Sequence, residues 1–269
     1  MPSTRVSVPV ALALALLSLL LPTALAQAPD AAAIVAQAHE ALGGASKLAG
    51  VKTFTATGRT RQLRGNNLVP IEFEINCELP SRFVRHDEIP AQDTDPTTTG
   101  FDGDQLIVFP PIRVPPARAG GDAQPGRGGP GANPAQQRLI QVKQDFARLM
   151  LGAFVASFSS YPLTLKYVGQ AEAPEGIADV LDVAGPAGFS ARLIVQRSTH
   201  LPVMLIWQGV QQGKPAEFRL FYGDYRDVDG LKWPFRLRRA IGSDTIEETT
   251  FDRVRINPKI DPKKFETPG

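Results

Sequence analysis

The chain of 269 residues contains only one cysteine and three histidines. A single cysteine excludes an internal disulfide, so an apolar core must supply the stability. Cys77 lies among alternating apolar residues, which indicates a small buried hydrophobe rather than a nucleophile. His39, His86 and His200 stand far apart, and no two of them have the spacing of metal ligands. The sequence therefore argues against a zinc site.

Motifs for catalysis are also scarce. The sequence has no Gly-x-Ser-x-Gly elbow and no glycine-rich phosphate loop with its lysine. Acidic residues cluster near Asp87 and near Asp227, but without the spacing of a twelve-residue calcium loop, and Asp-Gly pairs suit hairpin turns. We therefore expect no catalytic residue, no metal and no cofactor. A hydrolase that uses an unrecognised acid and base pair is the alternative.

An excess of charge of one sign is lacking as well. The chain has 29 basic and 27 acidic side chains. This near balance gives no case for a nucleic-acid partner or for binding to a strongly anionic membrane surface.

One long apolar run lies at the N-terminus. It extends from Val8 to Leu21 behind the charged Arg5, and the small-residue triplet at positions 24–26 follows it, which is the order of a secretory signal peptide. The run is shorter than the ~20 residues that span a bilayer. We therefore predict a signal peptide over residues 1–26, cleaved after Ala26, with a retained anchor as the alternative. Gln27 stands where a lipoprotein would have its cysteine, so we expect an exported protein without a lipid anchor.

Residues 27–269 are expected to form one strand-rich domain, although two small domains would also fit this length. Asp30 can cap a helix whose apolar face ends before Gly43 and Gly44. From Val51 onward the apolar period changes to two, most clearly between Val69 and Leu79. With the turn residues between them, the segments predict about ten or eleven strands in a mostly antiparallel meander, a sheet large enough to curl.

Two segments interrupt this pattern. Residues 110–134 are rich in Pro, Gly, Arg and Ala, which predicts a mobile surface loop. Asn133 and Pro134 then begin a second amphipathic helix over residues 135–154. A loop that feeds a helix inside a β domain fits a lid, and a helix that plugs the core of the sheet fits equally well.

Two tryptophans and one arginine stand out in the C-terminal strands. Trp207 and Trp233 suit core positions better than a ligand platform. The alternation from Trp233 through Leu237 directs Arg239 toward the buried face, where a guanidinium needs a partner. That partner is either a carboxylate, such as Glu248 on the following strand, or a polar group of a ligand.

Several short motifs together resemble one known family. They are the Ala-Leu-Gly-Gly end of the first helix, Gly58 in a strand, Glu-Leu-Pro-Ser-Arg-Phe at 78–83, Phe-Asp-Gly at 101–103, Asp-Val-Asp-Gly-Leu-Lys-Trp-Pro-Phe at 227–235, and the ending over 254–265. The combination resembles the periplasmic lipoprotein-carrier superfamily, the outer-membrane lipoprotein-sorting proteins of the LolA and LolB type. It covers most of the chain after residue 26. The chain departs from that pattern at Leu106 and Ile107, where carriers commonly have Trp, and in the loop 110–134.

The resemblance implies a mainly β fold, in which a large curved antiparallel sheet forms an unclosed half barrel and two helices cover its concave face. It also implies a soluble periplasmic carrier of lipoprotein acyl chains or another lipid, with envelope donor and acceptor proteins as further partners. Each CH₂ group removed from water contributes ~0.8 kcal/mol, which amounts to on the order of 10 kcal/mol for one long acyl chain. Apolar side chains should therefore dominate binding. The expected lining is Phe54, Ile71, Phe73, Ile75, Phe146, Leu149, Met150, Phe154, Trp233, Phe235 and Leu237.

A few polar groups should orient such a ligand. Arg239 is one candidate, and the resemblance adds an inward arginine near the first strands, for which Arg59, Arg61 and Arg82 qualify. The alternative for the whole protein is a non-enzymatic structural or interaction module of the cell envelope, whose interior would be filled by side chains.

Overall fold

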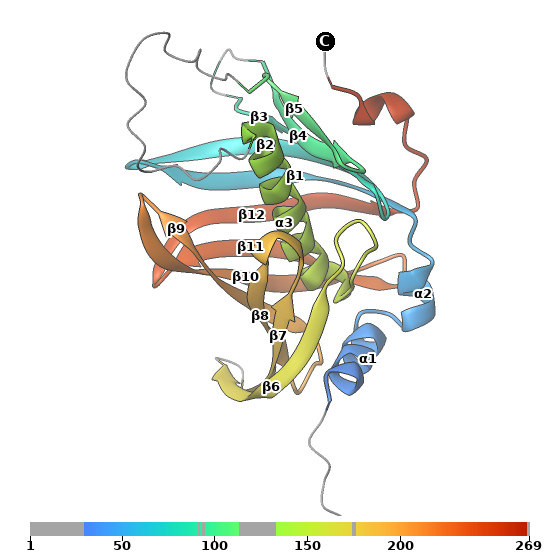
Figure 1. The fold of residues 1–269 in the computed structure, drawn as a ribbon. Coiled ribbons are helices and arrows are strands. Elements are labelled where there is room, and N and C mark those ends of the chain that lie inside the picture. The colour runs from blue at the N-terminus through green and yellow to red at the C-terminus, as the bar shows by residue number, and fades with distance from the viewer. Residues whose placement is uncertain (1–29, 91, 93–94, 113–132, 174–175, 268–269) are drawn as a thin grey trace, which may run out of the picture.

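The computed structural model describes residues 30–90, 92, 95–112, 133–173 and 176–267. The predicted signal peptide and most of the predicted loop 110–134 lie outside the described residues. Twelve strands form one sheet in the order β5-β4-β3-β2-β1-β12-β11-β10-β9-β8-β7-β6 (Figure 1).

The strands are β1 (Thr53–Arg64), β2 (Asn67–Glu78), β3 (Arg82–Glu88), β4 (Thr97–Asp102), β5 (Gln105–Phe109), β6 (Thr164–Ala173), β7 (Gly176–Ala184), β8 (Ser190–Gln196), β9 (Pro202–Gln211), β10 (Lys214–Val228), β11 (Leu231–Ile241) and β12 (Asp244–Ile256). The α-helices are α1 (Ala31–Ala41), α2 (Ala45–Ala49) and α3 (Pro134–Phe154), and two short 3₁₀ helices are η1 (Pro186–Gly188) and η2 (Pro262–Phe265).

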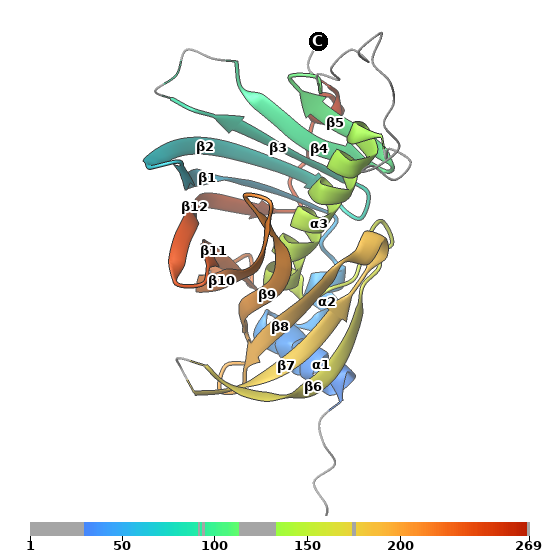
Figure 2. The ribbon, with the colours of Figure 1, turned by 60° about the vertical axis from the view of Figure 1, so that its left-hand side comes forward.

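The sheet is an antiparallel meander whose first and last strands pair with each other. β1 lies between β2 and β12, so the two ends of the strand sequence meet in the middle of the sheet. The free edges are β5 and β6, which follow each other along the chain, and α3 connects them across the concave face (Figures 1 and 2). The prediction of a mainly β, unclosed antiparallel sheet with an inserted helix is confirmed.

Both predicted helices begin where the sequence places their caps. The Asp30 carboxylate accepts a hydrogen bond from the Ala33 amide at 2.7 Å, and the Asn133 side chain accepts one from the Ala135 amide at 3.0 Å. Side-chain acceptors at these positions satisfy amides that have no partner inside the helix. Local sequence therefore fixes where each helix starts.

Helix α3 separates two hydrophobic clusters. One side packs against β1 to β5, β11 and β12 through Val142, Phe146, Leu149, Met150, Ala153 and Phe154. The other side packs against α1 and the half of the sheet from β6 to β10 through Ala147, Leu151 and Val155. Figure 2 shows α3 running between these two halves. The helix is therefore buried on two sides, which is the plug arrangement that the sequence left open beside the lid.

Polar contacts fix the position of α3 on the sheet. Two tyrosines of β10 donate hydrogen bonds to helix carbonyls, Tyr222 to Arg148 O at 2.6 Å and Tyr225 to Gly152 O at 2.8 Å. In the middle of the helix, Lys143 Nζ donates to Asp104 Oδ1 at 2.7 Å. A Cβ added at Gly152 would lie 2.2 Å from the ring of Tyr222, so the helix approaches β10 closely at that point.

Gly152→Ala is expected to destabilise the fold by about 1–3 kcal/mol, because the buried Tyr222 ring cannot move away while its hydroxyl is bonded to α3. Helix propensity alone would favour alanine by about 1 kcal/mol, so the close approach decides the sign. Urea unfolding measures the effect. Gly223→Ala is the control, because its Cβ would meet only Arg236 O, at 4.0 Å; equal stability of the two variants would contradict the packing argument.

Candidate ligand-binding site

A cavity of about 430 Å³ lies between α3 and the concave face of the sheet. Its walls come from β1 to β4, from β10 to β12, and from one side of α3. The apolar part of the lining is Ile71, Ile75, Phe83, Val142, Leu149, Leu220, Leu237 and Phe251. The charged part is Arg64, Arg85, Asp87, Arg138, Asp145, Arg148, Arg239 and Glu247. The cavity is therefore amphipathic.

Four of the apolar residues expected from the sequence line this cavity. Ile71 and Ile75 come from β2, Leu149 from α3 and Leu237 from β11. Alternation places Ile71 and Ile75 on the same face of β2, because side chains two apart in a strand point the same way. These residues supply an apolar wall on three different elements.

The other expected lining residues fill the interior beside the cavity. Phe54, Phe154 and Trp233 form a mutual contact, with ring centroids 6.3, 5.1 and 5.7 Å apart for the three pairs. Phe73 packs edge-on against Phe251, with centroids 5.5 Å apart. All of them belong to the same buried cluster, together with Phe146, Met150 and Phe235. Aromatic side chains thus occupy much of the space under α3.

Arg239 extends from β11 into the cavity, as the alternation predicted. The register places Glu247 of β12 opposite it, and the Arg239 Nη2 to Glu247 Oε1 distance is 3.6 Å. Glu248, the partner offered by the sequence, instead accepts a hydrogen bond from Arg236 Nε at 2.7 Å, so that suggestion was wrong. Burial acts to lower the pKa of Arg239, but the negative charges of Glu247 and Asp145 outweigh it and the pKa is raised. The guanidinium is therefore charged.

Arg148 reaches the cavity from α3. Its guanidinium carbon lies 4.5 Å from the ring centroid of Trp207, and its Nη1 donates to Asp145 Oδ1 at 2.9 Å. A flat guanidinium over an indole face is held by cation–π attraction. Burial lowers the pKa of Arg148, Asp145 counteracts this, and the nearby positive charge of Arg239 adds to the lowering. Arginine still remains protonated in such surroundings. Two positive charges therefore act on each other across the cavity.

A third arginine extends the cationic wall along β3. Arg85 Nε donates to Asp87 Oδ1 at 2.7 Å, and Nη2 donates to Thr60 Oγ1 at 3.1 Å. Thr60 in turn shares a 2.9 Å hydrogen bond with Thr249 of β12. Strand alternation could have predicted that Arg85 points toward the concave face, because Arg85 lies two residues after the buried Phe83 on the same strand.

Arg59 and Arg82 lie away from this cavity. Arg59 forms an exposed ion pair with Asp252 at 3.2 Å. Arg82 pairs with Glu78 and Asp102, both at 3.4 Å. Exposed pairs of this kind contribute little to stability. Arg239 is the expected orienting residue that the fold brings together with the apolar wall.

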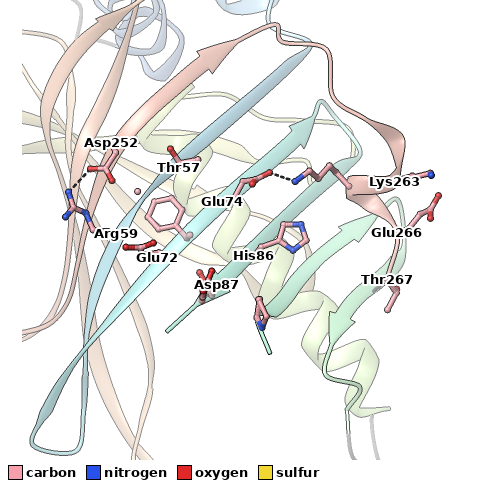
Figure 3. Close-up of a pocket in the computed structure, with 15 residues that line it drawn as sticks. Thr57, Arg59, Glu72, Glu74, His86, Asp87, Asp252, Lys263, Glu266 and Thr267 are labelled. Carbon is pink, nitrogen blue, oxygen red and sulfur yellow. Dashed lines mark hydrogen bonds and ion pairs between the residues drawn. The ribbon is translucent and has the colours of Figure 1, made fainter. Parts of the chain in front are cut away.

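A larger hollow of about 830 Å³ opens between the outer face of β1 to β3 and the segment that contains η2. Two ion pairs lie within its lining, Arg59 with Asp252 and Lys264 with Glu74, and dashed lines mark them in Figure 3. Burial acts to raise the pKa of Glu74, but hydrogen bonds from Asn76 and Lys264 outweigh it and the pKa is lowered. This hollow is larger than the cavity under α3, but most of its lining residues are charged, which does not suit an apolar ligand. We therefore assign the candidate site for an apolar ligand to the cavity under α3.

Comparison with solved structures identifies the fold. The chain aligns with the crystal structure of a LolA superfamily protein from Nitrosomonas europaea at 14% sequence identity and a TM-score of 0.56, over 89% of this chain and 99% of that one. The chain has a LolA-like fold. No protein-family model and no curated protein sequence matches it.

Two further structures align less closely with this LolA-like fold. One is a putative outer membrane lipoprotein-sorting protein domain from Vibrio parahaemolyticus, at 8% identity and a TM-score of 0.47, over 85% of this chain and 97% of that one. The other is a DUF1329 family protein from Desulfovibrio piger, at 10% identity and a TM-score of 0.46, over 87% and 96% of the two chains.

Two kinds of feature are absent from the described residues of the LolA-like fold. None of its described helices combines the length and the apolar composition needed to cross a membrane. The described part of the chain also holds no group of three or more His, Cys, Asp or Glu side chains that could bind a metal ion.

Because of the cavity, substitution by alanine should reduce the unfolding free energy by different amounts at two leucines of α3. Leu151 is fully buried in the cluster toward α1, whereas Leu149 lines the cavity. We expect Leu151→Ala to cost about 3–5 kcal/mol of unfolding free energy and Leu149→Ala about 2 kcal/mol or less, because the side chain of Leu149 already lacks neighbours on one side. Urea unfolding of both variants tests this. A cost for Leu149→Ala equal to that for Leu151→Ala would mean that the space is closed in solution.

Proposed function

We propose that the protein is an exported carrier or binding protein that holds a hydrophobic ligand, a lipoprotein acyl chain or another lipid, in the cavity between α3 and the concave sheet. The observation that carries this proposal is the cavity of about 430 Å³ with apolar lining residues from α3 and five strands, within a LolA-like fold. That volume lies in the range of ~300–1,000 Å³ typical of ligand pockets.

Burial of methylene groups supplies the binding energy in this proposal. Each CH₂ moved out of water contributes about 0.8 kcal/mol, so eight of them contribute about 6 kcal/mol before the cost of association. The aromatic cluster around Phe54 and Trp233 occupies the neighbouring space. The cavity therefore suits one chain or part of one, rather than several chains side by side.

The arrangement of charges supports binding rather than catalysis. The three carboxylates of the cavity, Asp87, Asp145 and Glu247, each form an ion pair with an arginine. A general base must be able to reach a substrate proton, and these carboxylates are held by guanidinium groups. The site we propose has no catalytic residue and needs no cofactor or metal.

The predicted signal peptide indicates the compartment in which the proposed carrier would work. A chain that is exported and not lipidated would work in the periplasm, and it would shield its ligand from water between an envelope donor and an envelope acceptor. The N-terminal residues that carry this prediction lie outside the described structure.

A non-enzymatic interaction module of the cell envelope is the second candidate. The observation in its favour is the filled aromatic interior, because a carrier for long acyl chains needs more open volume than a scaffold does. Ligand uptake separates the two. Native mass spectrometry of the mature protein, expressed from the full chain, is expected to show a bound lipid, and the neutral dye N-phenyl-1-naphthylamine is expected to bind with enhanced fluorescence. A protein that is empty and does not bind the dye would contradict the carrier.

Filling the cavity should block uptake. Leu237→Trp places an indole in the open space beside β11, and we expect the dissociation constant for N-phenyl-1-naphthylamine to rise about tenfold or more because the apolar volume is lost. Fluorescence titration gives the constant. Val210→Trp is the matched control, since Val210 is 69% exposed at the end of β9, and it should leave the constant unchanged. The same affinity in all three proteins would place dye binding elsewhere.

A further inference from the structure

The cavity under α3 carries more positive than negative charge. Five arginines line it against three carboxylates, Asp87, Asp145 and Glu247. An excess of positive charge inside a partly enclosed space is costly unless an anion balances it. Arg64 and Arg138 are exposed, and Arg85, Arg148 and Arg239 each pair with one of the carboxylates. The net charge of the wall favours a negatively charged occupant.

Arg239 is the least satisfied of these arginines. Its closest contact with a carboxylate oxygen is the 3.6 Å approach to Glu247, which is longer than a hydrogen bond. Its Nε is buried and has no hydrogen-bond partner among the described residues. Glu247 meanwhile accepts a 3.1 Å hydrogen bond from Gln62. The guanidinium of Arg239 thus lines the cavity with one long ion pair, to Glu247, and with a buried Nε that has no acceptor among the described residues.

Arg148 approaches the same space from the opposite wall. Trp207 and Phe189 hold its guanidinium by ring contacts at 4.5 and 5.4 Å, so its orientation is fixed by packing. Its Nε is buried without a hydrogen-bond partner within the described part of the chain. The mutual repulsion of Arg148 and Arg239 is relieved when an anion lies between them. A planar guanidinium also matches carboxylate and phosphate oxygens, which it can bind through two parallel bonds.

We propose that the ligand is an anionic single-chain amphiphile, whose carboxylate or phosphate headgroup binds Arg239 and Arg148 while its chain lies against Ile71, Ile75 and Leu149. This inference rests on the proposed function, because it assigns the headgroup of the ligand in the same cavity. It also explains why the site is amphipathic. A neutral headgroup would not balance the excess of positive charge in the cavity.

Headgroup chemistry is tested by comparing ligands of one chain length. Calorimetric titrations with dodecanoate, dodecyl phosphate and dodecan-1-ol are expected to show that the two anions bind at least tenfold more tightly than the alcohol, the size of one charge-assisted hydrogen bond or more. Acetate and inorganic phosphate are expected to bind weakly, because they bury no chain. Tight binding of inorganic phosphate alone would overturn the amphiphile in favour of a free anion.

Variants locate the headgroup. Arg239→Met should reduce the affinity for dodecanoate about tenfold and leave that for dodecan-1-ol within twofold, and Arg239→Lys should give an intermediate loss because the charge stays and the fork is lost. Arg236→Met is the matched control, on the same strand and the opposite face, and should bind like the unchanged protein. Circular dichroism and thermal unfolding show whether each variant is folded. If Arg239→Met does not fold, Arg239→Lys and the ligand comparison still decide.

The outcomes separate the two proposals. Equal binding of dodecanoate and dodecan-1-ol, unaffected by Arg239→Met, would overturn the anionic headgroup and leave a carrier of neutral hydrophobic ligands. No binding of any twelve-carbon ligand, together with no uptake of N-phenyl-1-naphthylamine, would overturn the carrier itself.

Discussion

The burial of α3 on two sides is the constraint on which the rest of the structure depends. An antiparallel sheet that does not close into a barrel has no second sheet to cover its concave face, so a helix must supply the missing layer. Because α3 connects the two edge strands β5 and β6, it crosses the sheet and touches both halves. Each half then obtains its own hydrophobic cluster from one side of the same helix.

This arrangement also determines where open space remains. Phe146, Met150 and Phe154 fill the region under the C-terminal half of α3 with large side chains. In the same half of the helix, Asp145, Arg148 and Leu149 lie on a different side of α3, where the packing opens into the cavity. A charged side chain keeps solvent or a ligand nearby, because its desolvation without a partner is costly. The charged side chains of α3 therefore account both for the open space and for the charge of its lining.

The chemistry of the cavity follows from strands that are distant in sequence. Arg85 of β3, Arg239 of β11 and Arg148 of α3 meet because β1 and β12 pair in the middle of the sheet. Rings on neighbouring elements hold two of the guanidinium groups in place, Phe73 under Arg85 at 4.5 Å and Trp207 under Arg148. In the proposed function, guanidinium groups held by ring contacts would need less ordering when a ligand binds.

Period-two alternation in the strands and the caps of the two helices are local properties, and they allowed much of the fold to be read before any contact was known. Alternation predicted that Ile71 and Ile75 share one face of β2 and that Arg239 points inward. It could also have predicted that Arg85 points inward, because Arg85 follows the buried Phe83 by two residues. It offered Glu248 as the carboxylate partner of Arg239, whereas the partner is Glu247. The register between β11 and β12 shifts at a bulge after Arg239, and hydrogen bonding across strands sets that shift.

Residue periodicity, helix caps and the single cysteine were enough to establish that the protein is strand-rich, that a capped helix is inserted among the strands, and that no internal disulfide supports the core. Which aromatic residues fill the interior and which apolar residues face open space became clear only from the packed fold, because packing depends on the combined volume of side chains from many elements. The packed fold also decided that Arg148, whose helix looks amphipathic with one apolar side, lies in the cavity. A helix buried on two sides places some polar residues between its apolar faces, and only its neighbours show whether those residues meet water or a binding site.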